Sequence, residues 1–213
     1  MSEDSPQVPP PYVIRTERLT LRCWEPRDAP LLGEALDSSL DHLRPWMPWA
    51  DDEPTPLDER IDRLRRFRGM FDQGQDFIYG LFTRDETEVV GGSGLHTRVG
   101  EGALEIGYWL RTSRVGAGLA REAAAALTYV AFRVCEVDRV EIRIDPANER
   151  SLGVPRALGF VEEGTFRRRL PAGPDGVPRD MVLFAVFRGD FDGLAMSRMT
   201  LEAFDALGRR LLV

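Results

Sequence analysis

One stretch near the middle of the chain constrains the fold most, because a strand-like segment runs through a glycine turn into a long helix. Residues 104–110 read Leu-Glu-Ile-Gly-Tyr-Trp-Leu, and residues 116–120 read Gly-Ala-Gly-Leu-Ala, before an Ala-rich segment that is a strong helix former. The first N–H groups of a helix lack internal partners, and the helix dipole adds about half a positive charge there. Small side chains leave those groups open, so the segment predicts a phosphate site.

The amino-acid composition excludes several lysine-dependent mechanisms. All 28 basic residues are Arg, so a Walker A lysine, a Schiff-base lysine and a catalytic lysine base are excluded. The net charge of -7 argues against nucleic acid as a partner and suits a cationic substrate such as an amine. Cys23 and Cys135 form no Cys-x-x-Cys pair, so we expect no metal site and two buried thiols.

The sequence shows neither a signal peptide nor an apolar run of the ~18 residues that a membrane span needs. We therefore expect a cytoplasmic protein with no membrane partner.

The order of elements predicts an α/β (α+β) fold with a mixed sheet rather than a strict βαβ alternation. We expect strands at residues 19–24, 77–82, 88–97, 103–110, 139–144, 160–170 and 181–187, and helices at residues 25–37, 58–72, 116–134 and 148–158. The short links between residues 77 and 110 imply an antiparallel meander.

Three parts are expected along the chain. Residues 1–12 read as a disordered leader, because three consecutive prolines block regular structure. Residues 13–190 read as one domain. Residues 191–213 read as an extension, helical at 200–211, that is a candidate dimer interface.

Three interpretations of the glycine turn compete. It can be a simple tight turn before a helix. It can be a dinucleotide-binding turn, although Arg121 stands where a third small residue belongs and the meander does not suit that fold. The third interpretation, a site for the pyrophosphate of coenzyme A, fits the full order of elements best.

At this point the chain resembles the GNAT superfamily of acyl-CoA-dependent N-acetyltransferases, and within it the RimJ/RimL branch that acetylates ribosomal-protein N-termini. The family signature Gln/Arg-x-x-Gly-x-Gly/Ala aligns with residues 115–120, except that the first position is Val115. Further matching segments are Thr16–Arg22, Leu43–Trp49, Gly91–His96, Glu105–Trp109, Asn148–Ser151, Leu158–Phe160 and Arg179-Asp180. The resemblance covers residues 13–190 and implies a mostly antiparallel sheet with a splayed strand pair, flanked by helices.

The resemblance also implies acetyl-CoA as cofactor and the residues that hold it. Its pantetheine arm would lie between the third and fourth core strands, and Asn148 and Ser151 would contact it near the sulfur. Asn148 can equally be a helix N-cap. Arg114 or Arg121 would supply the charge that Val115 lacks. The implied cofactor-binding residues are Tyr108, Trp109, Leu110, Val115, Gly116, Ala117, Gly118, Leu119, Ala120, Asn148 and Ser151.

Two residues are candidates for proton transfer. Glu105 lies on an otherwise apolar strand, where a buried carboxylate suggests a general base. The alternative is that Glu105 lies at the wet end of the strand or pairs with an arginine. The resemblance implies that the Ser151 hydroxyl protonates the leaving thiolate, directly or through water. Other GNAT branches carry a tyrosine acid where Pro155 stands, so the acid must come from elsewhere or be bulk water.

The acceptor side is less defined. Trp46 and Trp49 are candidates for its wall, although they can also simply anchor their loop in the core. His96 ends a strand near the expected acceptor position, so it is a substrate-binding candidate and a minor catalytic one. His42 is a weaker candidate, and both histidines can be structural.

The sequence therefore predicts direct transfer of an acetyl group from acetyl-CoA to a primary amine in a ternary complex. The branch resemblance favours a protein or peptide N-terminal α-amine. The alternatives are a non-catalytic acyl-CoA-binding module, and acetylation of a small-molecule amine such as a polyamine or an antibiotic.

Overall fold

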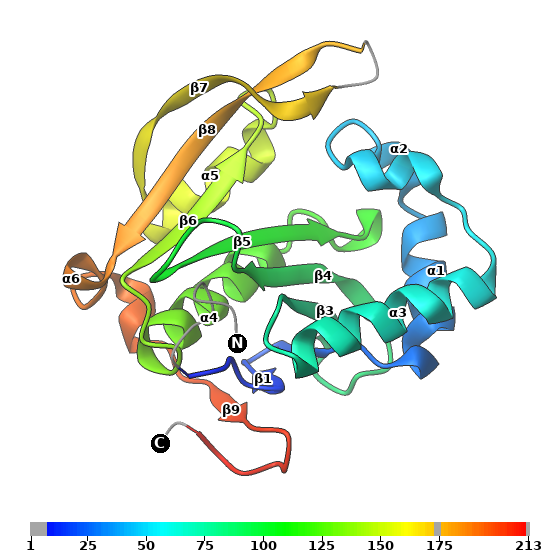
Figure 1. Cartoon of the computed structure of the whole chain (residues 1–213), viewed down its shortest axis with the longest axis horizontal. Helices are drawn as coiled ribbons and strands as arrows, with labels where there is room; N and C mark the ends of the chain where they lie inside the picture. Colours follow the sequence, from blue (N-terminus) through cyan, green and yellow to red (C-terminus); the bar gives the residue numbers. More distant parts are fainter. Residues whose placement is uncertain (1–7, 173–175, 212–213) are drawn as a thin grey trace.

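The computed structural model describes residues 8–172 and 176–211, and within them one sheet has the strand order β7-β8-β6-β5-β4-β3-β2-β1-β9 (Figure 1). The strands are β1 (Val13–Arg15), β2 (Leu19–Cys23), β3 (Phe77–Thr83), β4 (Val89–His96), β5 (Ala103–Leu110), β6 (Arg139–Ile144), β7 (Val161–Ala172), β8 (Pro178–Phe187) and β9 (Glu202–Phe204). The α-helices are α1 (Ala29–Asp37), α2 (Leu40–Leu43), α3 (Leu57–Asp72), α4 (Leu119–Arg133), α5 (Glu149–Leu158) and α6 (Arg188–Phe191). Short 3-10 helices are η1 (Pro26–Asp28), η2 (Pro48–Asp52), η3 (Thr112–Arg114) and η4 (Ala195–Arg198).

Strand direction follows from the connections. Tight turns join β3, β4 and β5, which pair antiparallel as the meander predicts. The chain then passes through α4 before β6, and this longer connection makes β5 and β6 a parallel pair. The mixed, mostly antiparallel sheet expected from the sequence is confirmed.

The sheet separates two apolar cores. Leu104 and Ile106 of β5 lie in the larger core with α4, whereas Trp109 packs against the smaller core that contains Trp24 and residues of α1 and α3. Because successive side chains of a strand point to opposite faces, α4 and the smaller core lie on opposite sides of β5.

Both cysteines are buried and free. Burial raises the pKa of the Cys23 thiol to about 11 and raises the pKa of Cys135 further. The thiols thus behave as the small apolar residues expected from the sequence.

The β7–β8 hairpin extends beyond the sheet toward α2 (Figure 1). Arg179 on β8 ties the two together, because its Nη1 donates to the Pro45 carbonyl at 2.8 Å. The same guanidinium forms an ion pair of 3.1 Å with Asp145, which directly follows β6. Arg179 therefore links the segment that carries Trp46 and Trp49 to the C-terminal end of β6.

The C-terminal extension differs from the expected helix. Residues 202–204 form β9, which pairs antiparallel with β1, a strand that the sequence pattern did not predict. Leu201 and Ala203 are buried at strand spacing, and Asp205 accepts backbone N–H groups of Leu207 and Arg209 in a turn. The open edge of β1 offers backbone partners that outweigh local helix preference.

The expected leader lies partly outside the described residues, because the description begins at Val8. From Pro10 the chain differs from the expected disorder. Pro10 and Pro11 are buried, and the Tyr79 hydroxyl donates to the Pro11 carbonyl at 2.6 Å. Among the described helices, none has both the length and the apolar character that a bilayer crossing requires.

Candidate active site

A gap between paired strands forms the centre of the candidate site. β5 pairs with β4 over Glu105–Leu110 but with β6 only at Ala103, Leu104 and Glu105. Beyond Glu105 the two parallel strands part, although both continue. In the described part of the chain, the β6-facing main-chain groups of residues 106–110 therefore have no strand partner and can bind an extended ligand as an added strand.

The start of α4 forms the second part of the site. Gly118 is its N-cap in the left-handed region, with φ 77°, and Gly116 has φ 82°. Only glycine adopts these angles without strain. Within residues 8–172 and 176–211 no side chain caps the helix, and its first backbone bond runs from Glu122 N–H to the Gly118 carbonyl. The N–H groups of the first turn are thus available to an anion.

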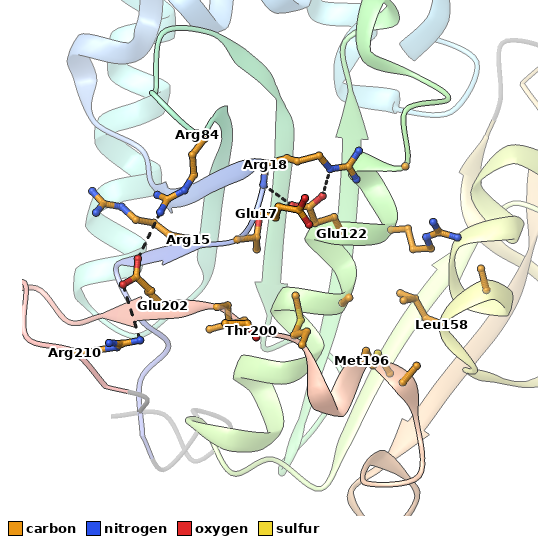
Figure 2. A pocket seen from close by; sticks show the side chains of 18 residues that line it. Arg15, Glu17, Arg18, Arg84, Glu122, Leu158, Met196, Thr200, Glu202 and Arg210 are labelled. Atoms are coloured by element: carbon orange, nitrogen blue, oxygen red, sulfur yellow. Dashed lines mark hydrogen bonds and ion pairs between the residues drawn. The ribbon is translucent and has the colours of Figure 1, made fainter.

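Arginines surround this helix start. An open pocket of about 1070 Å³ borders Gly118 and is lined by residues of the β1–β2 turn, α4, the end of α5 and the C-terminal segment (Figure 2). Arg121 lines it and is exposed, and among the described residues it has no ion-pair partner. Arg114, the other expected source of charge, is ion-paired with Glu88.

Sequence reasoning missed Arg18, which stands at the same helix start. Its Nη1 donates to the Ala117 carbonyl at 2.8 Å, and its Nε forms an ion pair of 2.5 Å with Glu122 (Figure 2). Arg18 belongs to the matching segment Thr16–Arg22, but neither spacing nor residue type linked that segment to a turn nearly a hundred residues away.

Tyr108, Asn148 and Ser151 meet across the parting of β5 and β6. The Tyr108 hydroxyl donates to the Ser151 carbonyl at 3.1 Å, and Ser151 Oγ lies 3.2 Å from the same hydroxyl. Asn148 Oδ1 accepts the Ser151 N–H at 3.2 Å, so Asn148 is the N-cap of α5. Burial raises the pKa of Tyr108 to about 12, against the opposing effect of the Ser151 hydrogen bond, so the phenol stays protonated at neutral pH.

Glu105 is buried on β5, as expected, but both of its oxygens contact arginine. Arg98 donates to them at 2.5 and 3.0 Å, and Arg143 Nε lies 3.6 Å from the carboxylate. To accept a substrate proton, Glu105 would have to give up part of this pairing. The geometry supports the arginine-paired alternative over the general base.

His96 pairs directly with Glu105 across β4 and β5, so the two side chains share one face of the sheet. Its Nδ1 lies 2.9 and 3.0 Å from the two carboxylate oxygens of Asp76, which precedes β3. Sequence spacing could not reveal this pair, because twenty residues and a complete strand separate its members.

The two tryptophans expected at the acceptor wall, Trp46 and Trp49, have different surroundings. Trp49 on η2 packs edge-to-face on Trp109 of β5, with ring centroids 5.9 Å apart, and is 37% exposed. Trp109 also lies over Gly92 of β4. Trp46 is half-buried and follows α2. Its backbone N–H donates to the Leu43 carbonyl at 2.9 Å. Trp49 and Trp109 thus lie together beside the parting, and the structure does not place Trp46 in ring contact with them.

A family model described as "Acetyltransferase (GNAT) domain" matches residues 18–161. The chain belongs to the GNAT acetyltransferase family. The match spans more than half of the sequence and includes the parting strands and the uncapped α4 helix. The family, the fold and the N-acetyltransferase class expected from the sequence are confirmed.

Curated relatives cover almost the whole domain. The chain is 30% identical over 187 residues to the "[Ribosomal protein uS5]-alanine N-acetyltransferase" of Escherichia coli (strain K12), which covers 85% of this chain and 94% of the relative. It is 29% identical over 179 residues to the "Putative ribosomal N-acetyltransferase YdaF" of Bacillus subtilis (strain 168), covering 83% and 95%.

Solved structures agree with the GNAT fold. Mycobacterium smegmatis RimJ in complex with CoA-disulfide has a TM-score of 0.72 at 26% identity, covering 87% of this chain and 90% of that one. RimL in complex with coenzyme A has a TM-score of 0.71 at 22% identity, covering 81% and 95%, and supports the fold alone.

Proposed function

We propose that the protein transfers an acetyl group from acetyl-CoA to the N-terminal α-amine of a protein or peptide. The observation that carries this proposal is the parting of β5 and β6 next to an uncapped, glycine-started α4. The curated relatives whose names specify ribosomal N-acetyltransferases support the acceptor class.

The residues of the site fit coenzyme A. Unpaired main-chain groups of Tyr108 to Leu110 suit the amide-bearing pantetheine arm, since that arm can add to the strand edge. The N–H groups at the start of α4 suit the pyrophosphate. When bound, the cofactor supplies an acetyl group activated as a thioester.

The chain's own residues divide the remaining work. A main-chain N–H on the free edge of β5 is available to polarise the thioester carbonyl. The Tyr108–Ser151 pair lies on the α5 side, where Ser151 is our candidate for protonating the departing sulfur. Trp49, Trp109 and His96 lie on the opposite face of β5 and form the acceptor side.

Arg121 gives a specific prediction about cofactor binding. Replacing it with alanine removes an unpaired charge beside the α4 start, so the KM for acetyl-CoA is expected to rise on the order of tenfold, with kcat little changed. Steady-state kinetics at low salt measure this. Arg66→Ala is the matched control, because Arg66 is also exposed on a helix but belongs to α3. Equal KM values for the two variants would contradict the role of Arg121.

Thiol release from acetyl-CoA tests the proposal as a whole. The acceptor panel comprises a peptide beginning with alanine, a polyamine, an aminoglycoside and free amino acids. Release with the peptide, and little with the others, is the expected result. Release with a small amine alone would assign the acceptor to that class. Calorimetric binding of acetyl-CoA without release to any acceptor would favour a non-catalytic binding module.

A further inference from the structure

The ring of His96 lies over two glycines of the central sheet. Its Nε2 is 2.7 Å from the position that a Cβ on Gly94 would occupy, and 3.3 Å from that of Gly107. These glycines are direct partners across β4 and β5. Any larger residue at Gly94 would collide with the imidazole, so the absence of side chains there creates room for the ring.

This location coincides with the parting of the strands. Gly107 is two residues beyond Glu105, the last β5 residue that pairs with β6. Nε2 of His96 therefore lies over the first free stretch of the β5 edge. Tyr108 follows Gly107 and turns its hydroxyl to Ser151 on the α5 side, so His96 and Ser151 flank the parting from opposite faces.

The other ring nitrogen is held by a carboxylate. Asp76 contacts Nδ1 with both oxygens, at 2.9 and 3.0 Å, and the side chains of His96 and Asp76 are 16% and 26% exposed. A carboxylate at Nδ1 favours the neutral tautomer that carries its proton there, which leaves a lone pair on Nε2. The same contact stabilises the imidazolium when Nε2 accepts a proton.

Charged groups approach the ring from each neighbouring element. Asp76 comes from the link between α3 and β3, and Glu105 lies opposite on β5. Arg98 and Arg143 both contact Glu105, from the turn after β4 and from β6. Glu105 is thereby matched by arginines, whereas the contact of Asp76 with His96 is not shared with an arginine at ion-pair distance in the described chain.

Resting on the proposed function, we infer that His96 is the general base that takes the proton of the acceptor amine, with Asp76 as its positioning residue. As the amine nitrogen bonds to the acetyl carbon and the carbon–sulfur bond breaks, Nε2 receives the proton that the nitrogen loses. The imidazolium then releases this proton to solvent, while the sulfur leaves as a thiol after protonation. One amine and one thioester thus give one amide and one thiol.

The tautomer can be read directly by NMR, independently of turnover. The chain has only two histidines, so ¹⁵N-histidine labelling gives two rings, and His42→Gln assigns them. The neutral His96 ring is expected to carry its proton on Nδ1, and Asp76→Asn is expected to disturb that state. A neutral His96 ring with its proton on Nε2 would overturn the inference.

Kinetics with acetyl-CoA and the alanine peptide complete the test. His96→Gln is expected to lower kcat/KM on the order of a hundredfold at neutral pH, with acetyl-CoA binding by calorimetry unchanged. Asp76→Asn should give a smaller loss and a shifted pH profile. His96→Ala is expected to regain activity with added imidazole, which a purely structural role does not explain.

The outcomes separate the two proposals. If His96→Gln keeps at least a third of the wild-type activity, or if Glu105→Gln loses more activity than His96→Gln does, the role of His96 is overturned. The proposed function is untouched by either result. No turnover by the wild type with any amine would overturn the proposed function, while the NMR result would still report the orientation of the ring.

Discussion

Valine in place of Gly118 is expected to weaken acetyl-CoA binding on the order of a hundredfold. Gly118 is the N-cap of α4 at φ 77°, a conformation that a β-branched residue adopts only with strain. If the backbone shifted to relieve that strain, the first N–H groups of the helix would no longer point together at the proposed pyrophosphate position. Each hydrogen bond to a charged group contributes about 1.5–3 kcal/mol, so loss of one or two accounts for the effect.

Gly100→Val is the matched control for this prediction. Gly100 has φ 94° in the turn between β4 and β5, and a Cβ there would meet no atom within 4 Å. A Cβ at Gly118 would make only ordinary contacts, 3.6 Å from Arg18 and 3.9 Å from Arg121. Both variants should lose similar thermal stability, but only Gly118→Val should lose acetyl-CoA binding by calorimetry. Equal binding by the two variants would show that the start of α4 does not hold the cofactor.

Loss of the Glu53 carboxylate is expected to give the largest change in stability, about 3–5 kcal/mol for Glu53→Ala in urea unfolding. The Glu53 side chain is fully buried and forms ion pairs with Arg60 and Arg63 of α3. Arg44 donates to its carbonyl at 2.9 Å. Removing the carboxylate leaves Arg63 without a carboxylate partner among the described residues and leaves Asp37 as the remaining ion-pair partner of the buried Arg60. It also loosens the segment that carries Trp49.

The same carboxylate gives a pH dependence with a defined sign. Burial alone would raise the pKa of Glu53, but hydrogen bonds from Arg63 and the Thr55 N–H, with the nearby arginine charges, lower it below its ordinary 4.5. The unfolded chain then binds a proton at a higher pH than the folded chain does. The stabilisation is therefore complete above about pH 4.5 and is lost as the pH falls through the lower folded value.

A surface pair supplies the comparison. Asp62 and Arg65 form an exposed ion pair one turn apart on α3, and Asp62→Ala is expected to change the free energy of unfolding by less than about 0.5 kcal/mol. The difference between wild type and Glu53→Ala should shrink below pH 4.5, whereas the Asp62→Ala difference should stay small. If both variants unfold alike at neutral pH, the buried network does not stabilise this segment.

Local patterns were sufficient for most of the central fold. Alternation and turn residues predicted β3, β4 and β5, and the Ala-rich run predicted α4 together with its glycine start. These elements form largely from near neighbours in sequence, so short-range rules describe them well. The failure at β9 has the opposite cause, since the strand that it pairs with, β1, lies far away in the sequence.

The site could be predicted only where one segment contains it. The backbone features of residues 108–120 lie along a continuous stretch, and the sequence pattern located them. Side-chain partners depend on packing between distant segments instead. The sheet and its connections bring three such sets of partners together. These are Arg98 and Arg143 with Glu105, Asp76 with His96, and Arg18 with Ala117. Residue type alone therefore favoured Glu105 as a base, before its arginine partners were visible.

One measurement tests the central claim, acetylation of an α-amine, most directly. Two peptides that differ only at the N-terminus and at one internal position would be incubated with acetyl-CoA and the full chain, and their masses determined by mass spectrometry. The first begins with a free alanine and contains no lysine, and the second has a blocked N-terminus and one internal lysine. We predict one added acetyl group on the first peptide and none on the second. Acetylation of the lysine peptide alone, or of neither peptide while a small amine is acetylated, would contradict the account.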